Sequence, residues 1–328
     1  DGVQSVLVAR TDAAGAFAAD FRGTVNLGPG WLAKVSVEPS PSTSAGAVAV
    51  VPQTRVGVGL TSVRGLADPG TPITVTLRAP NGAQRRIEPG LAGATGSWSV
   101  NMADFVPGGG DEVEVRAGDR IEILSIDGDP AVANVPTLTA LADADADSVG
   151  GTAPPGARLR VVAEGRSVNA TADGSGRWTA SFAGSLDVAA PMGGEVWLED
   201  GAFAFYTTWS VVRLNVELGG NFVTGNGPRG RAIQAVLRDA DGKVVATAHG
   251  RVFDRLAFGG AEVIIIGGEQ DSFYLDFLDL TGASVPIEAG DVLQVTAGDQ
   301  TVSFVVPALD GAVFVADDVI SGRTRAGA

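Results

Sequence analysis

Two groups of aspartates are the residues whose type and spacing could bind a metal ion. They are Asp127 and Asp129, followed by Asp143, Asp145 and Asp147. Alternate residues of an extended segment point to the same side, and carboxylate oxygens are ligands that Ca²⁺ prefers. We therefore predict a calcium site here, where the bound ion would stiffen a joint between two domains. Alternating Asp and Ala is also typical of a solvated edge strand that avoids pairing with other chains, and this alternative remains open.

The chain offers little else for chemistry. His249 is the single histidine, and no recognisable nucleophile motif follows it, so a Ser-His-Asp triad has no support. With one histidine and no cysteine, the usual zinc sites cannot form. Carboxylate pairs such as Asp276 and Asp279 are expected by chance among 38 acidic residues. The Gly-rich run 107–110 is followed by Asp111 instead of the lysine of a phosphate loop. We predict no enzymatic activity, no cofactor apart from calcium, and a surface or strand-end position for His249.

Charge and hydropathy exclude two further kinds of partner. The formal net charge is −15, whereas binding to nucleic acid needs a basic face. An acidic surface also opposes adsorption to anionic lipid. The longest apolar runs, such as residues 263–266, have the length of a buried strand and not of a membrane helix. We predict no nucleic-acid partner and no membrane span.

The elements that would position these residues are indicated by a repeated signature. A β-branched residue stands two positions before a glycine, and a second glycine follows five positions later. The copies are Val63, Gly65 and Gly70; Val149, Gly151 and Gly156; Val223, Gly225 and Gly230; and Ile320, Gly322 and Gly327. Four copies in order indicate a repeat. We interpret each as a strand that ends in a tight turn, where glycine adopts positive φ without steric cost.

A second signature predicts a strand with one buried face. It alternates apolar and mostly polar residues, which is the period of a half-buried strand. The copies run over residues 15–21, 96–102, 176–182 and 271–277, and their first aromatic residues are Phe17, Trp98, Trp178 and Phe273. We predict that these aromatic side chains pack in cores and do not form a ligand platform.

The closing segments Val-Val-Pro, Val-Pro and Val-Val-Arg divide the chain into units. We predict whole units at 53–136, 137–213 and 214–307, with 1–52 as the C-terminal part of a further unit and 308–328 as the N-terminal part of one. Short β-branched runs separated by turn residues are typical of a sandwich, and 46 Gly with 17 Pro argue against helices. The predicted fold is all-β, built from tandem immunoglobulin-like β-sandwiches, with a split partial sandwich at the two ends.

One strand is missing from the split unit. In the whole units it follows the second glycine, at residues 73–78, 159–162 and 233–237, and precedes the turns Asn81-Gly82, Glu164-Gly165 and Asp241-Gly242. The chain itself begins Asp1-Gly2. A sandwich short of one strand exposes edges that another chain can fill.

The run Val149-Gly-Gly-Thr-Ala-Pro-Pro-Gly156, followed by Thr171-Ala-Asp-Gly-Ser-Gly-Arg-Trp178, resembles bacterial immunoglobulin-like tandem repeats of large secreted and cell-surface proteins. The resemblance covers all three whole units and is weakest in 214–307, where a longer middle segment intervenes. It implies a spacer, stalk, fibre or adhesin module outside the cell, without enzymatic activity of its own.

Two arrangements would satisfy the split unit. In the first, the sequence is part of a longer tandem-repeat protein. In the second, slightly favoured, copies of the chain join head to tail, with residues 308–328 of one copy pairing with residues 1–52 of the next and a partner strand filling the vacancy. Such a contact need not close on itself and then makes filaments. Both arrangements predict a structural protein of an extracellular filament or surface stalk.

A second function class remains open. The unit 214–307 carries a group of aromatic residues that could present a glycan- or protein-binding face, as in an adhesin. They are Phe253, Phe258, Phe273, Tyr274 and Phe277. An exposed aromatic patch would favour this hypothesis, and burial in strand alternation would oppose it.

Overall fold

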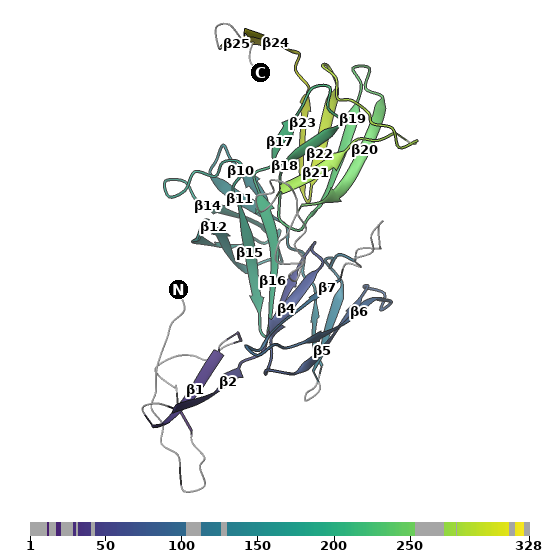
Figure 1. Cartoon of the computed structure of the whole chain (residues 1–328). Helices are drawn as coiled ribbons and strands as arrows, with labels where there is room; N and C mark the ends of the chain where they lie inside the picture. Colours follow the sequence, from purple (N-terminus) through teal and green to yellow (C-terminus); the bar gives the residue numbers. More distant parts are fainter. Residues whose placement is uncertain are drawn as a thin grey trace.

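A computed structural model gives the fold. It describes residues 12, 18–20, 29–30, 32–40, 43–102, 113–125, 130–252, 272–279, 281–314 and 319–324, without the side chains of 32–49 and 309–324. These residues form strands and turns and no helix (Figure 1), which confirms the all-β class. Over the same ranges, no helix of the length and hydropathy needed to cross a bilayer occurs.

Seven consecutive strands make a first unit with two sheets. They are β3 (Gln53–Gly57), β4 (Ser62–Leu66), β5 (Pro72–Arg78), β6 (Gln84–Leu91), β7 (Ser97–Asn101), β8 (Arg120–Ser125) and β9 (Ala131–Asn134). The neighbours β3-β4-β7 belong to one sheet, and β6-β5-β8-β9 form the other. The first, second and fifth strands therefore share one sheet, and the fourth, third, sixth and seventh share the second.

The same order occurs twice more. The second unit contains β10 (Leu141–Asp143), β11 (Ser148–Thr152), β12 (Arg158–Ala163), β13 (Arg166–Thr171), β14 (Arg177–Ser181), β15 (Gly193–Asp200) and β16 (Phe203–Ser210). The third contains β17 (Arg213–Val216), β18 (Phe222–Asn226), β19 (Ala232–Arg238), β20 (Val244–Arg251), β21 (Ser272–Asp276), β22 (Val292–Ala297) and β23 (Gln300–Val305). Their neighbours run β10-β11-β14 with β13-β12-β15-β16, and β17-β18-β21 with β20-β19-β22-β23.

This order differs from the constant-type immunoglobulin domain, in which the fourth strand lies in the sheet of the first, second and fifth. Here the fourth strand pairs with the third. The cause is the tight turn between them, since Gly82, Gly165 and Gly242 have φ of 84°, 72° and 84° and fold the chain directly into an antiparallel hairpin. The predicted turns are therefore confirmed, and they set the strand order.

The first glycine of the repeated signature lies inside the second strand, opposite the aromatic residue of the fifth strand. The pairs are Gly65 with Trp98, Gly151 with Trp178, and Gly225 with Phe273. A Cβ on Gly65 would lie 2.5 Å from Cζ2 of Trp98. The predicted strand that ends in a turn gave this glycine no role of its own. Glycine occurs there because an aromatic ring crosses its backbone.

The second glycine is the turn residue that the sequence predicted. Gly70, Gly156 and Gly230 have φ of 81°, 76° and 70°. Each donates its N–H to a carbonyl just beyond the fourth strand, at 2.9, 3.0 and 3.1 Å. The repeat of this bond shows that the loop between the second and third strands has one geometry in all three units.

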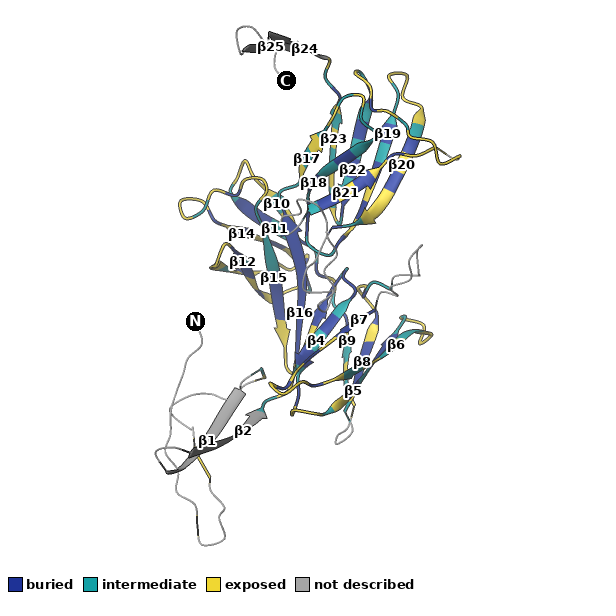
Figure 2. Cartoon of the chain, viewed as in Figure 1, coloured by how far each residue is buried: buried dark blue, intermediate teal, exposed yellow. Residues whose placement is uncertain are grey.

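The cores consist of the inward-facing residues of paired sheets, and Figure 2 shows burial alternating along many strands. On β7 and β14 every second residue is buried. Trp98, Trp178 and Phe273 are 5 %, 3 % and 6 % exposed, so their predicted core role is confirmed. Each large side chain that is fully buried contributes about 1.5–3 kcal/mol.

Two hairpins flank the three units and lie at opposite ends of the view in Figure 1. The first pairs β1 (Leu32–Ser40) with β2 (Thr43–Val50), and the second pairs β24 (Leu309–Phe314) with β25 (Val319–Thr324), both antiparallel. The Gly30 N–H donates to the Val51 carbonyl at 2.9 Å. The copy of the aromatic signature at 15–21 falls largely outside the described residues.

Candidate interface between the units

A single sheet passes from the second unit into the first. The last strand of the second unit, β16, pairs in parallel with the first strand of the first unit, β3, from Phe203 with Thr54 to Tyr206 with Gly57. The resulting seven-stranded sheet has the order β13-β12-β15-β16-β3-β4-β7. Thr54 N–H donates to the Ala202 carbonyl at 2.9 Å, and Val58 N–H donates to the Tyr206 carbonyl at 2.7 Å. The two units therefore share backbone hydrogen bonds as well as side-chain contacts.

The composition of β16 explains why it becomes a central strand. All eight residues of β16 are buried, and none of them is charged. The corresponding last strands β9 and β23 alternate between partly buried and exposed residues instead. A continuous run without charges is typical of a strand covered on both faces. This signal in 203–210 was present in the sequence and was missed.

An aromatic and arginine layer covers the outside of this shared sheet. The rings of Trp197 and Tyr206 stack with centroids 4.8 Å apart. The guanidinium of Arg64 lies 5.0 Å from the centre of the Tyr206 ring, and those of Arg55 and Arg160 lie 5.6 and 5.7 Å from Trp197. Two of the arginines belong to the first unit and the aromatic residues to the second. Cation–π attraction therefore acts across the joint.

Hydrogen bonds orient this layer. Glu195 accepts a hydrogen bond from the Trp197 indole at 3.0 Å, and its other carboxylate oxygen lies 3.9 Å from Arg64. The hydroxyls of Tyr206 and Ser62 are 2.9 Å apart. Burial lowers the pKa of Arg55 from its ordinary value, and the neighbouring Arg64 lowers it further. The direction of this shift indicates that Arg55 is held in a partly desolvated joint.

The third unit reaches the other two through Arg231, which is 9 % exposed. Its Nη1 donates to the carbonyl of Val58 in the first unit at 3.2 Å and to Oγ1 of Thr207 in the second unit at 3.4 Å. Its Nη2 lies 3.0 Å from Oδ1 of Asp299. A Cβ on Gly59 would lie 1.8 Å from this guanidinium. One side chain thus contacts all three units.

Two further contacts secure the third unit. The Thr208 hydroxyl donates to the Arg229 carbonyl at 2.7 Å. Arg251 donates to the Gly230 carbonyl at 2.7 Å and to Glu114 of the first unit at 3.3 Å. The first and third units are therefore in direct contact, although a whole unit separates them in the sequence.

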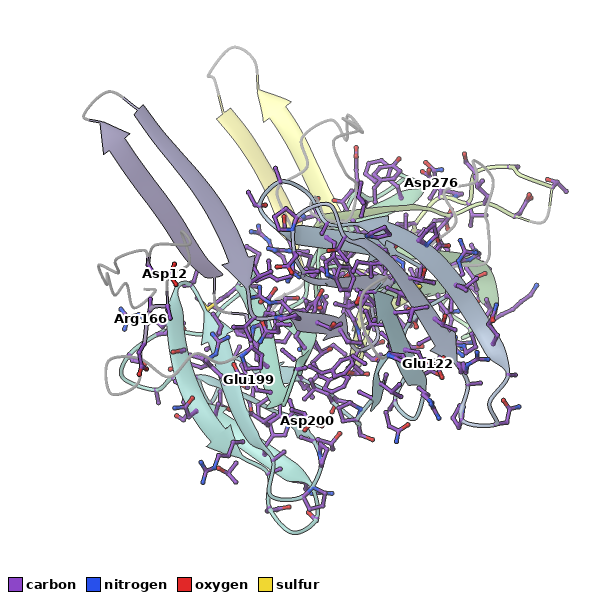
Figure 3. The ribbon with its side chains drawn as sticks, turned by 90° about the horizontal axis from the view of Figure 1, so that it is seen from below. Asp12, Glu122, Arg166, Glu199, Asp200 and Asp276 are labelled. Carbon is purple, nitrogen blue, oxygen red and sulfur yellow. The ribbon has the colours of Figure 1, made fainter. Side chains whose placement is uncertain are left out.

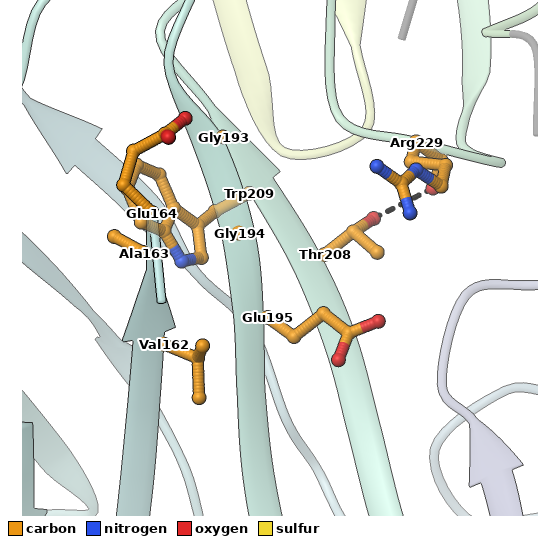
Figure 4. A pocket seen from close by; sticks show the side chains of 9 residues that line it. All are labelled: Val162, Ala163, Glu164, Gly193, Gly194, Glu195, Thr208, Trp209 and Arg229. Atoms are coloured by element: carbon orange, nitrogen blue, oxygen red, sulfur yellow. Dashed lines mark hydrogen bonds between the residues drawn. The ribbon is translucent and has the colours of Figure 1, made fainter. Parts of the chain in front are cut away.

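A cavity of about 270 Å³ adjoins this joint. It is lined by β12, β15 and β16 together with Arg229, and Figure 4 shows Glu164, Glu195 and Trp209 around it. The lining residues include the carboxylates of Glu164 and Glu195 and the hydroxyl of Thr208, which donates to the Arg229 carbonyl. We assign the cavity to the packing of the joint.

Three aspartates of the predicted calcium site, Asp143, Asp145 and Asp147, do not lie on one extended segment. Asp143 ends β10, whereas Asp145 and Asp147 lie in the turn between β10 and β11, and Asp147 has a φ of 45°. Oδ1 of Asp143 accepts the N–H of Ala146 at 3.1 Å, and Oδ1 of Asp147 accepts the N–H of Val188 at 2.8 Å. The geometric premise of the prediction is therefore wrong for 144–147, because the strand ends there.

The calcium hypothesis itself stays a prediction. Asp127 and Asp129 lie outside the described residues. Within the described ranges, no three or more His, Asp or Glu side chains gather where they could hold a metal ion. Figure 3 shows Glu122 and Asp276 apart from each other and from the sequence neighbours Glu199 and Asp200.

The other residues singled out from the sequence are also separated. His249 is exposed on the edge strand β20, a surface position as predicted. Phe273 and Phe277 are buried, while Tyr274 is 52 % exposed. Phe253 and Phe258 lie outside the described residues. The described members Phe273, Tyr274 and Phe277 therefore do not all lie on one face. The single exposed member of the group among the described residues is Tyr274.

The scan against protein-family models finds no match, and the search of curated proteins finds none. Among solved structures, a tetra-tandem repeat in the extending region of a large adhesion protein is 15 % identical, with 83 % of this chain and 81 % of that chain covered and a TM-score of 0.19. A Ca²⁺-stabilized adhesin with which an Antarctic bacterium reaches out and binds ice is 15 % identical, with coverages of 92 % and 83 % and a TM-score of 0.18. A 1.5-MDa bacterial ice-binding adhesin is 13 % identical, with coverages of 85 % and 96 % and a TM-score of 0.18. TM-scores this low carry no argument about function.

Proposed function

We propose that the chain is a non-enzymatic structural segment of an extracellular filament or surface stalk. The observation that carries this proposal is the seven-stranded sheet that continues from the second unit into the first. A stalk must keep its shape between domains, and relative motion is the default when domain interfaces are small and polar. A shared sheet and the buried Arg231 oppose such motion. The resemblance to bacterial immunoglobulin-like repeats supports the same role and a location outside the cell.

The boundaries 53–136, 137–213 and 214–307 are part of the proposal, as is a further unit formed from residues 1–52 and 308–328. The bond from Gly30 to Val51 in front of the first hairpin has counterparts from Gly118 to Val135 and from Gly290 to Val306, at 2.8 and 2.9 Å. Those counterparts belong to hairpins of sixth and seventh strands. The hairpin of β24 and β25 is antiparallel like the first two strands of each unit.

Strand order adds a requirement to the head-to-tail joint. In the proposed head-to-tail joint the partner strand takes the place of a third strand, and in the first unit the third strand β5 pairs with both β6 and β8. The partner strand would therefore enter the middle of a sheet, where both of its edges are paired. This is a larger gain in backbone hydrogen bonds than an edge addition provides.

Negative-stain electron microscopy together with the intact mass of the natural protein tests the proposal. We expect filaments or stalks made of stacked units. Head-to-tail joining of chains with a mass near 33.1 kDa would be abolished by deletion of 308–328. A much heavier polypeptide without dissociable subunits would exclude the head-to-tail joint and retain the stalk. Compact particles without elongated assembly, or turnover of a hydrolase substrate that is lost in His249→Ala, would contradict the structural role.

A further inference from the structure

An aromatic pair stands on the outward side of the sheet β17-β18-β21 in the third unit. The rings of Phe222 on β18 and Tyr274 on β21 are stacked, with centroids 5.2 Å apart and planes 22° from parallel. The neighbours Phe273 and Leu275 point into the core and are 6 % and 4 % exposed, whereas Tyr274 is 52 % exposed. The pair therefore lies on the solvent side of the sheet and contributes little to the core.

The other units show that the fold does not require aromatic residues at these two positions. The residue before the Val-x-Gly signature is Ser62 in the first unit, Ser148 in the second and Phe222 in the third. The residue after the core aromatic of the fifth strand is Ser99, Thr179 and Tyr274, in the same order. Small hydroxyl residues occupy both positions in two units, and large aromatic residues occupy both in the third. The paired change at two contacting positions indicates a role beyond folding.

Polar groups adjoin the rings on the same side of the sheet. The Tyr274 hydroxyl donates to Oδ1 of Asp276 at 2.9 Å. Asp276 is directly opposite Phe222 in the strand register, and Thr224 is opposite Tyr274. On the next strand, Asn215 is exposed and opposite Thr224. The hydrogen bond to Asp276 raises the pKa of the Tyr274 hydroxyl. The face thus combines two rings with carboxylate, hydroxyl and amide groups.

This combination matches the chemistry of a sugar ring. A pyranose has an apolar C–H side that packs against an aromatic face, and hydroxyl groups around its rim that exchange hydrogen bonds with carboxylates and amides. Asp276 borders the rings, and the chain has a net charge of −15, which opposes polyanions. We propose that the face formed by Phe222, Tyr274 and Asp276 binds an uncharged saccharide.

The repeat itself supplies the test variant. The double substitution Phe222→Ser with Tyr274→Ser places in the third unit the residue types found at the matched positions of the first, so the unit is expected to fold. Thr179→Ser, at the matched position of the second unit, is the control. Binding is measured by the retardation of the native protein in gels containing soluble β-glucan, mannan or starch, with alginate as the anionic comparison. Titration calorimetry with the corresponding hexasaccharides then measures the affinity.

The expected result is retardation by at least one uncharged polysaccharide and none by alginate. The double variant should lose about tenfold or more in affinity, because a stacked ring pair contributes on the scale of a factor of ten. Asp276→Asn should weaken binding less, and Thr179→Ser should leave it unchanged. Equal retardation of the wild type and the double variant would overturn the proposal, as would the absence of retardation by every uncharged polysaccharide. Self-association that the double variant abolishes, seen by sedimentation velocity, would assign the face to a second copy instead.

Discussion

Gly65 lies directly opposite Trp98 in the pairing of β4 with β7, and the indole occupies the space that a side chain on Gly65 would need. A Cβ there would approach Cζ2 of Trp98 and the backbone carbonyl oxygen of Gln53 to 2.5 Å each. The same relationship recurs at Gly151 and at Gly225. The two sequence signatures therefore describe one contact, in which a glycine on the second strand leaves room for an aromatic ring on the fifth strand.

The first prediction follows from this contact. Gly65→Ala should destabilise the first unit by about 1–3 kcal/mol, the range for overpacking a core, because the backbone of Gln53 cannot move aside as a flexible side chain could. Chemical denaturation measures the loss. Gly174→Ala is the matched control, since nothing lies within 4 Å of a Cβ at Gly174, and it should be neutral or slightly stabilising. Equal stability of Gly65→Ala and wild type would refute the account.

The second prediction concerns the three-way contact of Arg231. Arg231→Ala removes its bonds to Val58, Thr207 and Asp299, and hydrogen bonds to a charged group contribute about 1.5–3 kcal/mol. We expect the third unit to move relative to the first two, which small-angle scattering would record as a larger radius of gyration. Arg238→Ala, at the other end of β19, is the control. An unchanged scattering profile for Arg231→Ala would show that the remaining contacts hold the joint.

The third prediction is a loss of stability in acid through two turn aspartates. Hydrogen bonds from the hydroxyls of Ser175 and Thr281, together with backbone N–H groups, lower the pKa of Asp173 and of Asp279. A folded-state pKa below the unfolded value of about 3.9 means that both carboxylates stabilise the fold above that pH. The contribution is lost as the pH falls through the folded pKa.

Thermal melting from pH 7 to pH 2 tests this sign. Asp173→Ala with Asp279→Ala should melt below wild type at neutral pH, and the difference should shrink towards pH 2. Ser175→Ala with Thr281→Ala keeps the backbone donors and should lose less. A difference that is independent of pH would show that the carboxylate charge does not matter.

The fourth prediction tests calcium. If Asp127, Asp129, Asp143, Asp145 and Asp147 bind the ion, a hundredfold excess of Ca²⁺ over its dissociation constant should stabilise the protein by about 2.7 kcal/mol. Addition of EDTA should reverse the effect, and Asp143→Asn with Asp145→Asn should abolish it. Mg²⁺ serves as the control ion. Equal melting temperatures in Ca²⁺ and in EDTA would refute the hypothesis of a calcium site.

Local patterns predicted most of the fold. The alternation around Trp98 and Trp178 predicted two half-buried strands, and the turns at Asn81-Gly82 and Glu164-Gly165 predicted hairpins, because each depends on neighbours in the sequence. The role of Gly65 was missed, since a glycine in a turn and a glycine under a ring look alike until the strand register is known. The turn at Asp145 was missed because Asp147 adopts a positive φ without being glycine.

The contacts between the three units were the part of the structure that the sequence predicted least well. Arg231 and Val58 are separated by 173 positions, and no local pattern relates them. The sequence did contain one relevant signal, the uncharged run 203–210, which distinguishes β16 from β9 and β23. Such a run indicates a strand covered on both faces, but only the structure shows that β3 is the neighbouring strand of the first unit.

The parallel direction of β3 and β16 determines how the joint responds to tension. The chain enters β3 from the N-terminal side and leaves β16 on the C-terminal side, so a pull along the polypeptide drags the two strands in opposite directions along their common axis. The hydrogen bonds between residues 54–57 and 203–206 are then loaded together in shear and cannot open one after another like a zipper. The seam between the first two units therefore acts as a mechanical clamp, and force would have to rupture it as a whole before either unit could unravel.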